Sequence, residues 1–446
     1  MRWLDRMPSG PAFLGPAPRI RGAPLPPGEA AARARPLLRR PSTYVLAIAY
    51  GLGAWRIGTV FGNGFADFPT ATATATVLFL LYAVPFVLLI RVIDYLEREP
   101  WRLQAMAVLW GGLVATSAAI SGGTAVQNML AKLVSPEAAA TWGPAISGAG
   151  VEEVVKVAGV VAIALVAPGQ INSMVDGFVY GALVGLGFQL IENIVFAVGA
   201  VALNAGVDAV GPVIATFLVR GVLGGLWSHT LFTALAGAGV AYALVRRDRP
   251  RWQRITVAVA LFGAAAGFHF LWNSPIFAGA ADLGLLGVAA VVLVKGIPAL
   301  LVGIALLVAA ERQEADYYAG LLAALGDSRI ATRDEIATLV SPRRRVAERR
   351  RARLRLGWAG ARAVGRLQRA QARLAAALAR DPGAEVLRRR RDVLSRRHQL
   401  LALGMNGRGR PARRPSARVA SAVGIAEALL VGLVLLGLAL AIRDLT

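Results

Sequence analysis

Two adjacent glutamates and a lysine interrupt an apolar run in the segment "GAGVEEVVKVAGV", residues 148–160. On a helix, Lys156 follows Glu152 by four residues and Glu153 by three, so its ammonium group can reach either carboxylate. One lysine neutralises only one of them. The remaining negative charge requires a bound proton or a second cation. The alternative to a functional site is an ion cluster that is neutralised in this way and has only a structural role. An excess of acid is also what a general base or a metal-binding site needs.

Further polar side chains recur in the apolar runs that follow. Glu192 and Asn193 stand together in "LIENIVF", His229 begins "HTLFTALAG", and His269 precedes Asn273 by one helical turn in "HFLWN". Ionisable groups inside a membrane are costly and face the bundle interior, where they usually mark function. A lone histidine in such a run is often only a packing hydrogen bonder, but two of the chain's three histidines lie here.

The run that carries Glu192 also has a glycine every four residues. Gly177, Gly181 and Gly185 form a stripe that lets a second helix approach closely. Glu192 is seven residues beyond Gly185, so it lies on the same face and points toward a neighbouring helix. Asp176 lies at the other end of this run, about 24 Å from Glu192 on a helix, where it either caps the helix or has a functional role.

Together these side chains can activate water in two ways. Carboxylates and imidazoles can hold Zn²⁺ and lower the pKa of its water, with Glu152, Glu192, His229 and His269 as candidate ligands. Alternatively, a glutamate acts as general base without a metal, while histidine and asparagine stabilise the oxyanion. Both routes lead to hydrolysis. The predicted catalytic residues are Glu152, Glu153, Glu192, His229 and His269, and the predicted supporting residues are Lys156, Asp176, Asn193 and Asn273.

The elements that position these residues are apolar helices. Hydrophobic residues make up 56% of the 446, and runs long enough to cross a bilayer recur along the chain. We therefore predict an all-α, polytopic membrane protein with eight core spans and one C-terminal span. The nine spans lie near 43–61, 72–91, 103–122, 144–167, 175–199, 212–245, 254–273, 284–310 and 421–442. The chain has no cysteine, which excludes disulfides and thiolate catalysis.

Arginine-rich and arginine-free connections alternate along the chain. The connections "RVIDYLEREPWR" and "RRDRPRWQR" are basic, whereas "FGNGFADFPT" and "NSPIFAGAAD" have no lysine or arginine. The positive-inside rule then places the N-terminus inside and the C-terminus outside the cytoplasmic membrane. Residues 212–245 are too long for one straight crossing, so we predict a short helix, a break around Gly224-Gly225 and then one crossing. In this orientation Glu152, Glu192, His229 and His269 all fall in the outer half of the bilayer.

The sequence divides into four parts. Residues 1–42 are rich in Pro, Gly, Ala and Arg and are predicted to be a disordered cytoplasmic tail. Residues 43–310 form the intramembrane core, and residues 421–446 form a C-terminal transmembrane anchor. Residues 311–420 hold 27 arginines against 10 acidic residues and are predicted to be a cytoplasmic helical segment on the anionic inner leaflet. No aromatic interleaving or known module points to nucleic acid, and none is expected as a partner.

Four motifs in this order resemble those of the PrsW family of intramembrane proteases. They are "EEVVK" at 152–156, "DGFVYGALVGLGFQLIEN" at 176–193, "HTLFTALAG" at 229–237 and "HFLWN" at 269–273. The resemblance covers about residues 44–310 and extends, more distantly, to the CAAX-prenyl endopeptidases. It implies a polytopic protease that acts in or beside the membrane on membrane-bound substrates such as anti-sigma factors. It also implies that the five catalytic candidates serve that activity. Family members are often described as metalloproteases, although the HExxH helix of many zinc proteases is absent.

Two other functions fit parts of the pattern. Intramembrane Glu, His and Lys also build proton relays, so a proton-coupled transporter is an alternative. No broken-helix repeat supports it, and the polar set lies off-centre in the bilayer. A catalytically silent membrane scaffold, which recruits partners through the arginine-rich segment, is the third possibility.

Overall fold

The computed structural model describes residues 41–405, except 97, 168, 205, 226–227 and 381–383. Residues 1–40 of the predicted N-terminal tail and the predicted ninth span therefore lie outside the described residues, and residues 41–42 of that tail belong to α2. All regular structure within the described residues is helical. The helices are α2 (Pro41–Asp67), α3 (Pro69–Ile93), α4 (Trp101–Leu109), η2 (Trp110–Ala115), α5 (Thr116–Leu133), α6 (Pro136–Ser147), η3 (Gly148–Glu152), α7 (Glu153–Val166), α8 (Met174–Leu203), α9 (Gly211–Thr216), η4 (Phe217–Leu223), α10 (His229–Val245), α11 (Arg251–Asn273), η6 (Ala278–Leu283), α12 (Leu285–Ala324), α13 (Arg333–Leu339), α14 (Pro342–Arg380) and α15 (Ala384–Ala402).

Six helices in the described residues are long and apolar enough to cross a membrane. They are 41–67, 69–93, 101–133, 174–203, 251–273 and 286–324. The all-helical, multi-pass prediction is confirmed, but the count of eight core spans is not. Two predicted spans are not among the six. Residues 144–167 lie in the continuous helical run of α6, η3 and α7, which carries Glu152, Glu153 and Lys156, whereas 212–245 is divided into α9, η4 and α10. An apolar run in the sequence shows that a segment is hydrophobic, but whether that segment forms one continuous helix depends on local backbone geometry.

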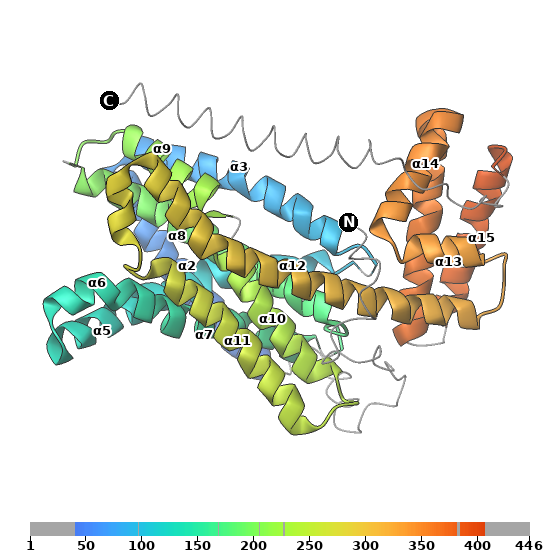
Figure 1. Ribbon diagram of the computed structural model, residues 1–446, viewed down its shortest axis with the longest axis horizontal. Helices are drawn as coiled ribbons and strands as arrows, with labels where there is room; N and C mark the ends of the chain where they lie inside the picture. The colour runs from blue at the N-terminus through green and yellow to red at the C-terminus, as the bar shows by residue number, and fades with distance from the viewer. Residues whose placement is uncertain are drawn as a thin grey trace.

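Helix α8 is the central element of the membrane core, and α10 packs along it (Figure 1). The predicted glycine stripe makes this approach possible. A Cβ atom on Gly177, Gly181 or Gly185 would collide with the α10 backbone, at Gly237, Thr233 and His229 respectively. Each of the three glycines therefore keeps α10 against α8 along successive turns. Because the third contact is at His229 itself, the packing also sets the position of this histidine.

The break predicted within 212–245 is present. The π-helical segment η4 ends at Leu223, and α10 begins only at His229. A Cβ on Gly225 would collide with the hydroxyl of Tyr82 on α3, so a larger residue here would displace that side chain. As a result, His229 stands in the first turn of a helix and not in the middle of one.

As far as residue 405, the arginine-rich segment folds into helices at one end of the molecule (Figure 1). We call α13, α14 and α15 the arginine-rich bundle. Its own apolar core includes Leu367 and Leu374 of α14 and Val393 of α15, together with Tyr318 from the far end of α12. Leu96, from the segment between α3 and α4, belongs to the same core. The bundle therefore docks on a connection that the sequence predicts to be cytoplasmic.

Candidate active site

A π-helical turn carries the paired glutamates. Glu152 is the last residue of η3, and Glu153 is the first residue of α7. Single π-turns within helices recur at functional sites because they re-aim the side chains that follow. Gly148 begins this turn and lies against α11, where a Cβ would come within 2.8 Å of both His269 Nε2 and Asn273 Nδ2. The glycine thus lets the glutamate turn sit directly on the histidine helix.

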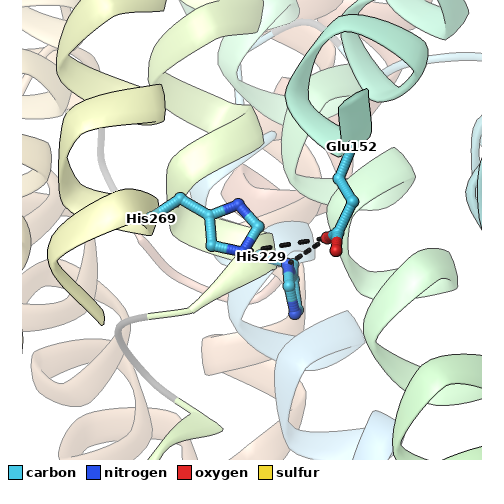
Figure 2. Close-up of side chains that lie close together, drawn as sticks. All are labelled: Glu152, His229 and His269. Carbon is cyan, nitrogen blue, oxygen red and sulfur yellow. Dashed lines mark ion pairs between the residues drawn. The ribbon is translucent and has the colours of Figure 1, made fainter. Parts of the chain in front are cut away.

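Three predicted residues from three separate helices meet at one point (Figure 2). Glu152 Oε2 lies 3.8 Å from His229 Nδ1 and 3.7 Å from His269 Nε2. These donor atoms all lie within 4.8 Å of one another. Glu152 keeps 14% of its side chain exposed, whereas His269 has no exposed side chain. Glu152 is therefore the most exposed member of the group.

A carboxylate stands behind each imidazole. Glu192 Oε2 lies 2.8 Å from His229 Nε2, and Glu153 Oε1 lies 2.8 Å from His269 Nδ1. Since a carboxylate can only accept, the ring nitrogen that faces it carries the proton. The remaining nitrogen of each neutral ring then has a lone pair, which accepts a hydrogen bond from Lys156 Nζ in His229 and from Asn273 Nδ2 in His269. Such carboxylate–histidine pairs hold metal-binding imidazoles in the tautomer and orientation that a metal needs.

Lys156 is fully buried and links both glutamates of the pair. Its Nζ lies 2.7 Å from Glu153 Oε1 and 3.4 Å from Glu152 Oε2, so it does reach both carboxylates. Nζ also lies 3.0 Å from His229 Nδ1 and 4.2 Å from the centre of the Phe188 ring. The ammonium group therefore contacts two members of the three-residue group, Glu152 and His229, as well as Glu153.

Arg220 is a further site residue, for which the sequence offered two roles, a pair with Glu192 or a place at a helix break. Its Nη2 lies 2.6 Å from Glu192 Oε2, and its Nε donates to Asn193 Oδ1 at 2.8 Å. The guanidinium group also stacks 3.9 Å from the ring centre of Phe196. It reaches α8 from the π-helical segment η4. The signal for this residue was an arginine in an apolar run, but its partner depends on how η4 folds back onto α8.

The buried charges do not balance. The site contains three carboxylates, Glu152, Glu153 and Glu192, and two cations, Lys156 and Arg220. With both imidazoles neutral, three negative and two positive charges leave one negative charge. An unpaired charge is costly in a buried site, so this arrangement favours an additional proton or a bound cation.

The predicted supporting residues occupy different places. Asn273 Nδ2 donates to His269 Nε2 at 3.1 Å, and Asn193 holds Arg220. Asp176 is in the first turn of α8, where it forms a capping box with Ser173 and is distant from the three-residue group. Two residues that the sequence analysis missed are Thr233, whose Oγ1 donates to Glu153 Oε2 at 3.5 Å, and Gln189, whose Oε1 accepts from the first turn of α10.

Residues 99–301 match the family model described as PrsW family intramembrane metalloprotease. This part of the chain is a PrsW-family domain. The match begins just before α4 and ends within α12, so the PrsW domain contains every predicted site residue, and the arginine-rich bundle lies outside it. The PrsW domain makes the chain a peptidase, that is, a hydrolase, and its apolar helices make it a multi-pass membrane protein. No curated protein and no solved structure matches the chain.

The residues of the PrsW domain fit the metal that the family description implies. One carboxylate and two imidazoles are donors that Zn²⁺ accepts, and one ion can bridge donor atoms this close together. The carboxylates of Glu192 and Glu153, which contact the far nitrogen of each imidazole, and the net negative charge of the site also favour a bound metal cation. Glu192, which the sequence analysis included among the candidate ligands, faces the opposite nitrogen of His229. Its geometry suits the support of a ligand better than ligation.

Proposed function

We propose that the chain is an endopeptidase of the cytoplasmic membrane that hydrolyses a peptide bond of a membrane-bound substrate, such as an anti-sigma factor. The observation that carries the proposal is the convergence of Glu152, His229 and His269, with a carboxylate behind each ring. Two ring nitrogens and one partly exposed carboxylate then lie around the same point. That is the arrangement needed to hold and deprotonate a water molecule.

The two adjacent glutamates have different roles in this proposal. Glu153 has no exposed side chain and is held by Lys156 and His269, so it orients and neutralises its neighbours. Glu152 is partly exposed and makes only longer contacts, of 3.4 to 3.8 Å. It is therefore the group that contacts water, either as a ligand or as the general base.

Zn²⁺ bound by Glu152, His229 and His269 would act as a Lewis acid and lower the pKa of water. The chain's own residues do the rest. Glu192, itself held by Arg220, positions His229, and Glu153 positions His269. Lys156 offsets the negative charge of the paired glutamates. If no metal binds, Asn273 is the group that donates to the oxyanion, His269 joins it only when its Nε2 is also protonated, and Glu152 is the base.

The substrate approaches from within the bilayer in this proposal. A transmembrane helix hides its peptide bonds in its own hydrogen bonds, so the scissile segment must unwind locally. The predicted orientation puts the site in the outer half of the membrane, with the N-terminus inside and the C-terminus outside. The docking of the arginine-rich bundle on the basic α3–α4 connection is consistent with one cytoplasmic end, next to the anionic leaflet.

The direct test is cleavage in proteoliposomes. The purified chain is reconstituted with a single-span anti-sigma factor, and products are followed by gel electrophoresis and mass spectrometry. We expect Glu152→Gln to abolish cleavage, because the amide can neither take up a proton nor replace the carboxylate charge. Glu137→Gln is the matched control, since Glu137 is exposed at the start of α6. Cleavage that survives Glu152→Gln combined with Glu153→Gln would refute the assignment, and flux driven by a pH gradient would favour a transporter.

A further inference from the structure

An open cavity of about 510 Å³ lies between the membrane core and the arginine-rich bundle. One wall is the α3–α4 connection, with Tyr95 and Arg98. The opposite wall is formed by α14 and α15. Its volume is in the range of small-molecule sites, which is about 300–1,000 Å³. The cavity is far in the sequence from the active-site residues and lies largely outside the family match.

Four guanidinium groups line this cavity, from three separate elements. They belong to Arg98, to Arg369 and Arg373 of α14, and to Arg389 of α15. The one carboxylate among the cavity-lining residues is Glu385, and it already pairs with Arg389 at 2.8 Å and with Arg388 at 3.5 Å. Within the part of the chain that the structure describes, Arg98, Arg369 and Arg373 form no ion pair. The cavity therefore concentrates positive charge without balancing it.

Arg369 lies among several of these cations. Partial burial lowers the pKa of its guanidinium group from the ordinary value; the interaction with Tyr95 opposes this shift, whereas the positive charges of Arg349, Arg98 and Arg373 add to it. The hydroxyl of Tyr95, also in the cavity wall, is buried without a hydrogen-bond partner in the described residues. Arg345 packs against the ring of Tyr95 at 3.7 Å. Unpaired donors and repelling cations are both features that a bound anion would satisfy.

We propose that this cavity binds a phosphate-bearing anion, through Arg98, Arg369 and Arg373. Guanidinium forks match the oxygens of a phosphate group and bind it through charge-assisted hydrogen bonds. Ala372, Ala376 and Ala377 of α14 leave room for the anion between the arginines. A compact group with two or more charges suits the convergence of cations from separate elements better than a single carboxylate does.

The bound anion would join the bundle to the core. Arg98 belongs to the connection between two core helices, whereas Arg369 and Arg373 belong to the bundle. The same chemistry is present in a lipid phosphate headgroup and in a free diphosphate. The α3–α4 connection, which follows one apolar span and precedes the next, lies where lipid headgroups are expected. This inference does not depend on the proposed proteolysis.

The test measures binding to the full-length protein with two probes. The first is inorganic pyrophosphate, titrated by calorimetry into the protein in a non-ionic detergent. The second is phosphatidic acid, tested by the thermal unfolding of the protein in phosphatidylcholine nanodiscs with and without this lipid. Binding of pyrophosphate identifies a soluble source, and stabilisation by phosphatidic acid alone identifies a lipid source. Either result supports the site, and we expect the interaction to weaken as salt rises.

Two matched double variants decide whether the effect belongs to the cavity. We expect Arg369→Gln/Arg373→Gln to weaken the response at least tenfold. The control is Arg343→Gln/Arg344→Gln, which removes the same charge from exposed positions at the start of α14. Arg98→Gln, in a different element, tests the site independently if the α14 variant unfolds. An equal response in the cavity variants and the control, or no response of the wild type to either probe, would overturn the proposal.

Discussion

Glu153 and His269 form a fully buried pair, with Glu153 Oε1 2.8 Å from His269 Nδ1 and no exposed side chain on either residue. The same carboxylate oxygen lies 2.7 Å from Lys156 Nζ. One carboxylate therefore fixes the tautomer of a histidine on α11 and neutralises a lysine on its own helix. This double role distinguishes Glu153 from Glu152, although the two are adjacent in the sequence.

We expect Glu153→Gln to destabilise the fold, whereas Glu152→Gln leaves it intact. Loss of the Glu153 charge leaves Lys156 buried without its nearest counter-charge, and breaking a buried pair in this way costs about 3–5 kcal/mol. The measurement is thermal unfolding of both variants in the same detergent. Equal melting temperatures for the two variants would contradict the different roles of the two glutamates.

Metal content tests the three-residue group. We expect near-stoichiometric zinc in the purified wild type and its loss in His229→Ala/His269→Ala, because each imidazole offers one of the converging donor atoms. His398→Ala is the control, since His398 is exposed on α15. Mass spectrometry of the metal gives the answer. Wild-type protein without metal would favour the route in which a glutamate alone acts as base.

Arg220 is expected to act as a positioning residue. Arg220→Gln removes the cation that holds Glu192 behind His229, and loss of such support lowers metal affinity or activity by about 10–100-fold. Arg220→Lys restores the charge but not the contact with Asn193, so we expect an intermediate effect. Zinc affinity is measured beside kcat and KM. Arg56→Gln, an exposed position on α2, is the control, and equal zinc affinity in all four proteins would refute this role.

The α8–α10 contact predicts a difference between two glycines of the same helix. Gly181→Ala places a methyl group against the α10 backbone at Thr233, whereas Gly199→Ala enters open space. We expect Gly181→Ala to cost about 1–3 kcal/mol of stability and to reduce activity, because overpacking displaces the helix that carries His229. Gly199→Ala should leave both unchanged. Thermal unfolding and the cleavage assay check this, and two indistinguishable variants would contradict it.

Stability should fall as pH rises, owing to a carboxyl cluster in the α3–α4 connection. Burial raises the pKa of Asp94 to about 7, and burial together with the negative charge of Asp176 raises the pKa of Glu99 to about 10. The folded chain therefore holds these protons more tightly than the unfolded chain, in which carboxyl groups titrate near pH 4. Their stabilising contribution is complete below about pH 4 and is lost as pH rises through about 7 for Asp94 and about 10 for Glu99.

Glu99→Gln tests this pH dependence. The amide oxygen can still accept from Tyr180, whose hydroxyl lies 2.5 Å from Glu99 Oε2, but it carries no titrating proton. We expect the melting temperature of this variant to change less between about pH 6 and pH 9 than that of the wild type. Glu137→Gln should behave as the wild type. A wild-type melting temperature that increases over this pH range would show that deprotonation of the cluster does not destabilise the fold.

Much of the site could be predicted because helical spacing is local. The apolar runs, the glycine stripe of α8 and the three-residue and four-residue spacing from the glutamates to Lys156 follow from the 3.6-residue period, and the structure contains each of them. The four motifs also identified the family before any helix was placed. For the same reason the break near Gly224 was foreseen, since the run was too long for one crossing.

The different roles of these residues follow only from the tertiary structure. Which glutamate meets water and which stands behind His269 depends on a π-turn and on the approach of α11 at Gly148, neither of which a periodic pattern encodes. The partner of Arg220 depends on η4 folding back onto α8. The cavity of the arginine-rich bundle depends on three elements meeting at one end of the molecule. Local propensity and charge, which the sequence determines, decide where helices form and which side chains they carry. Packing between distant segments decides which of these side chains come into contact.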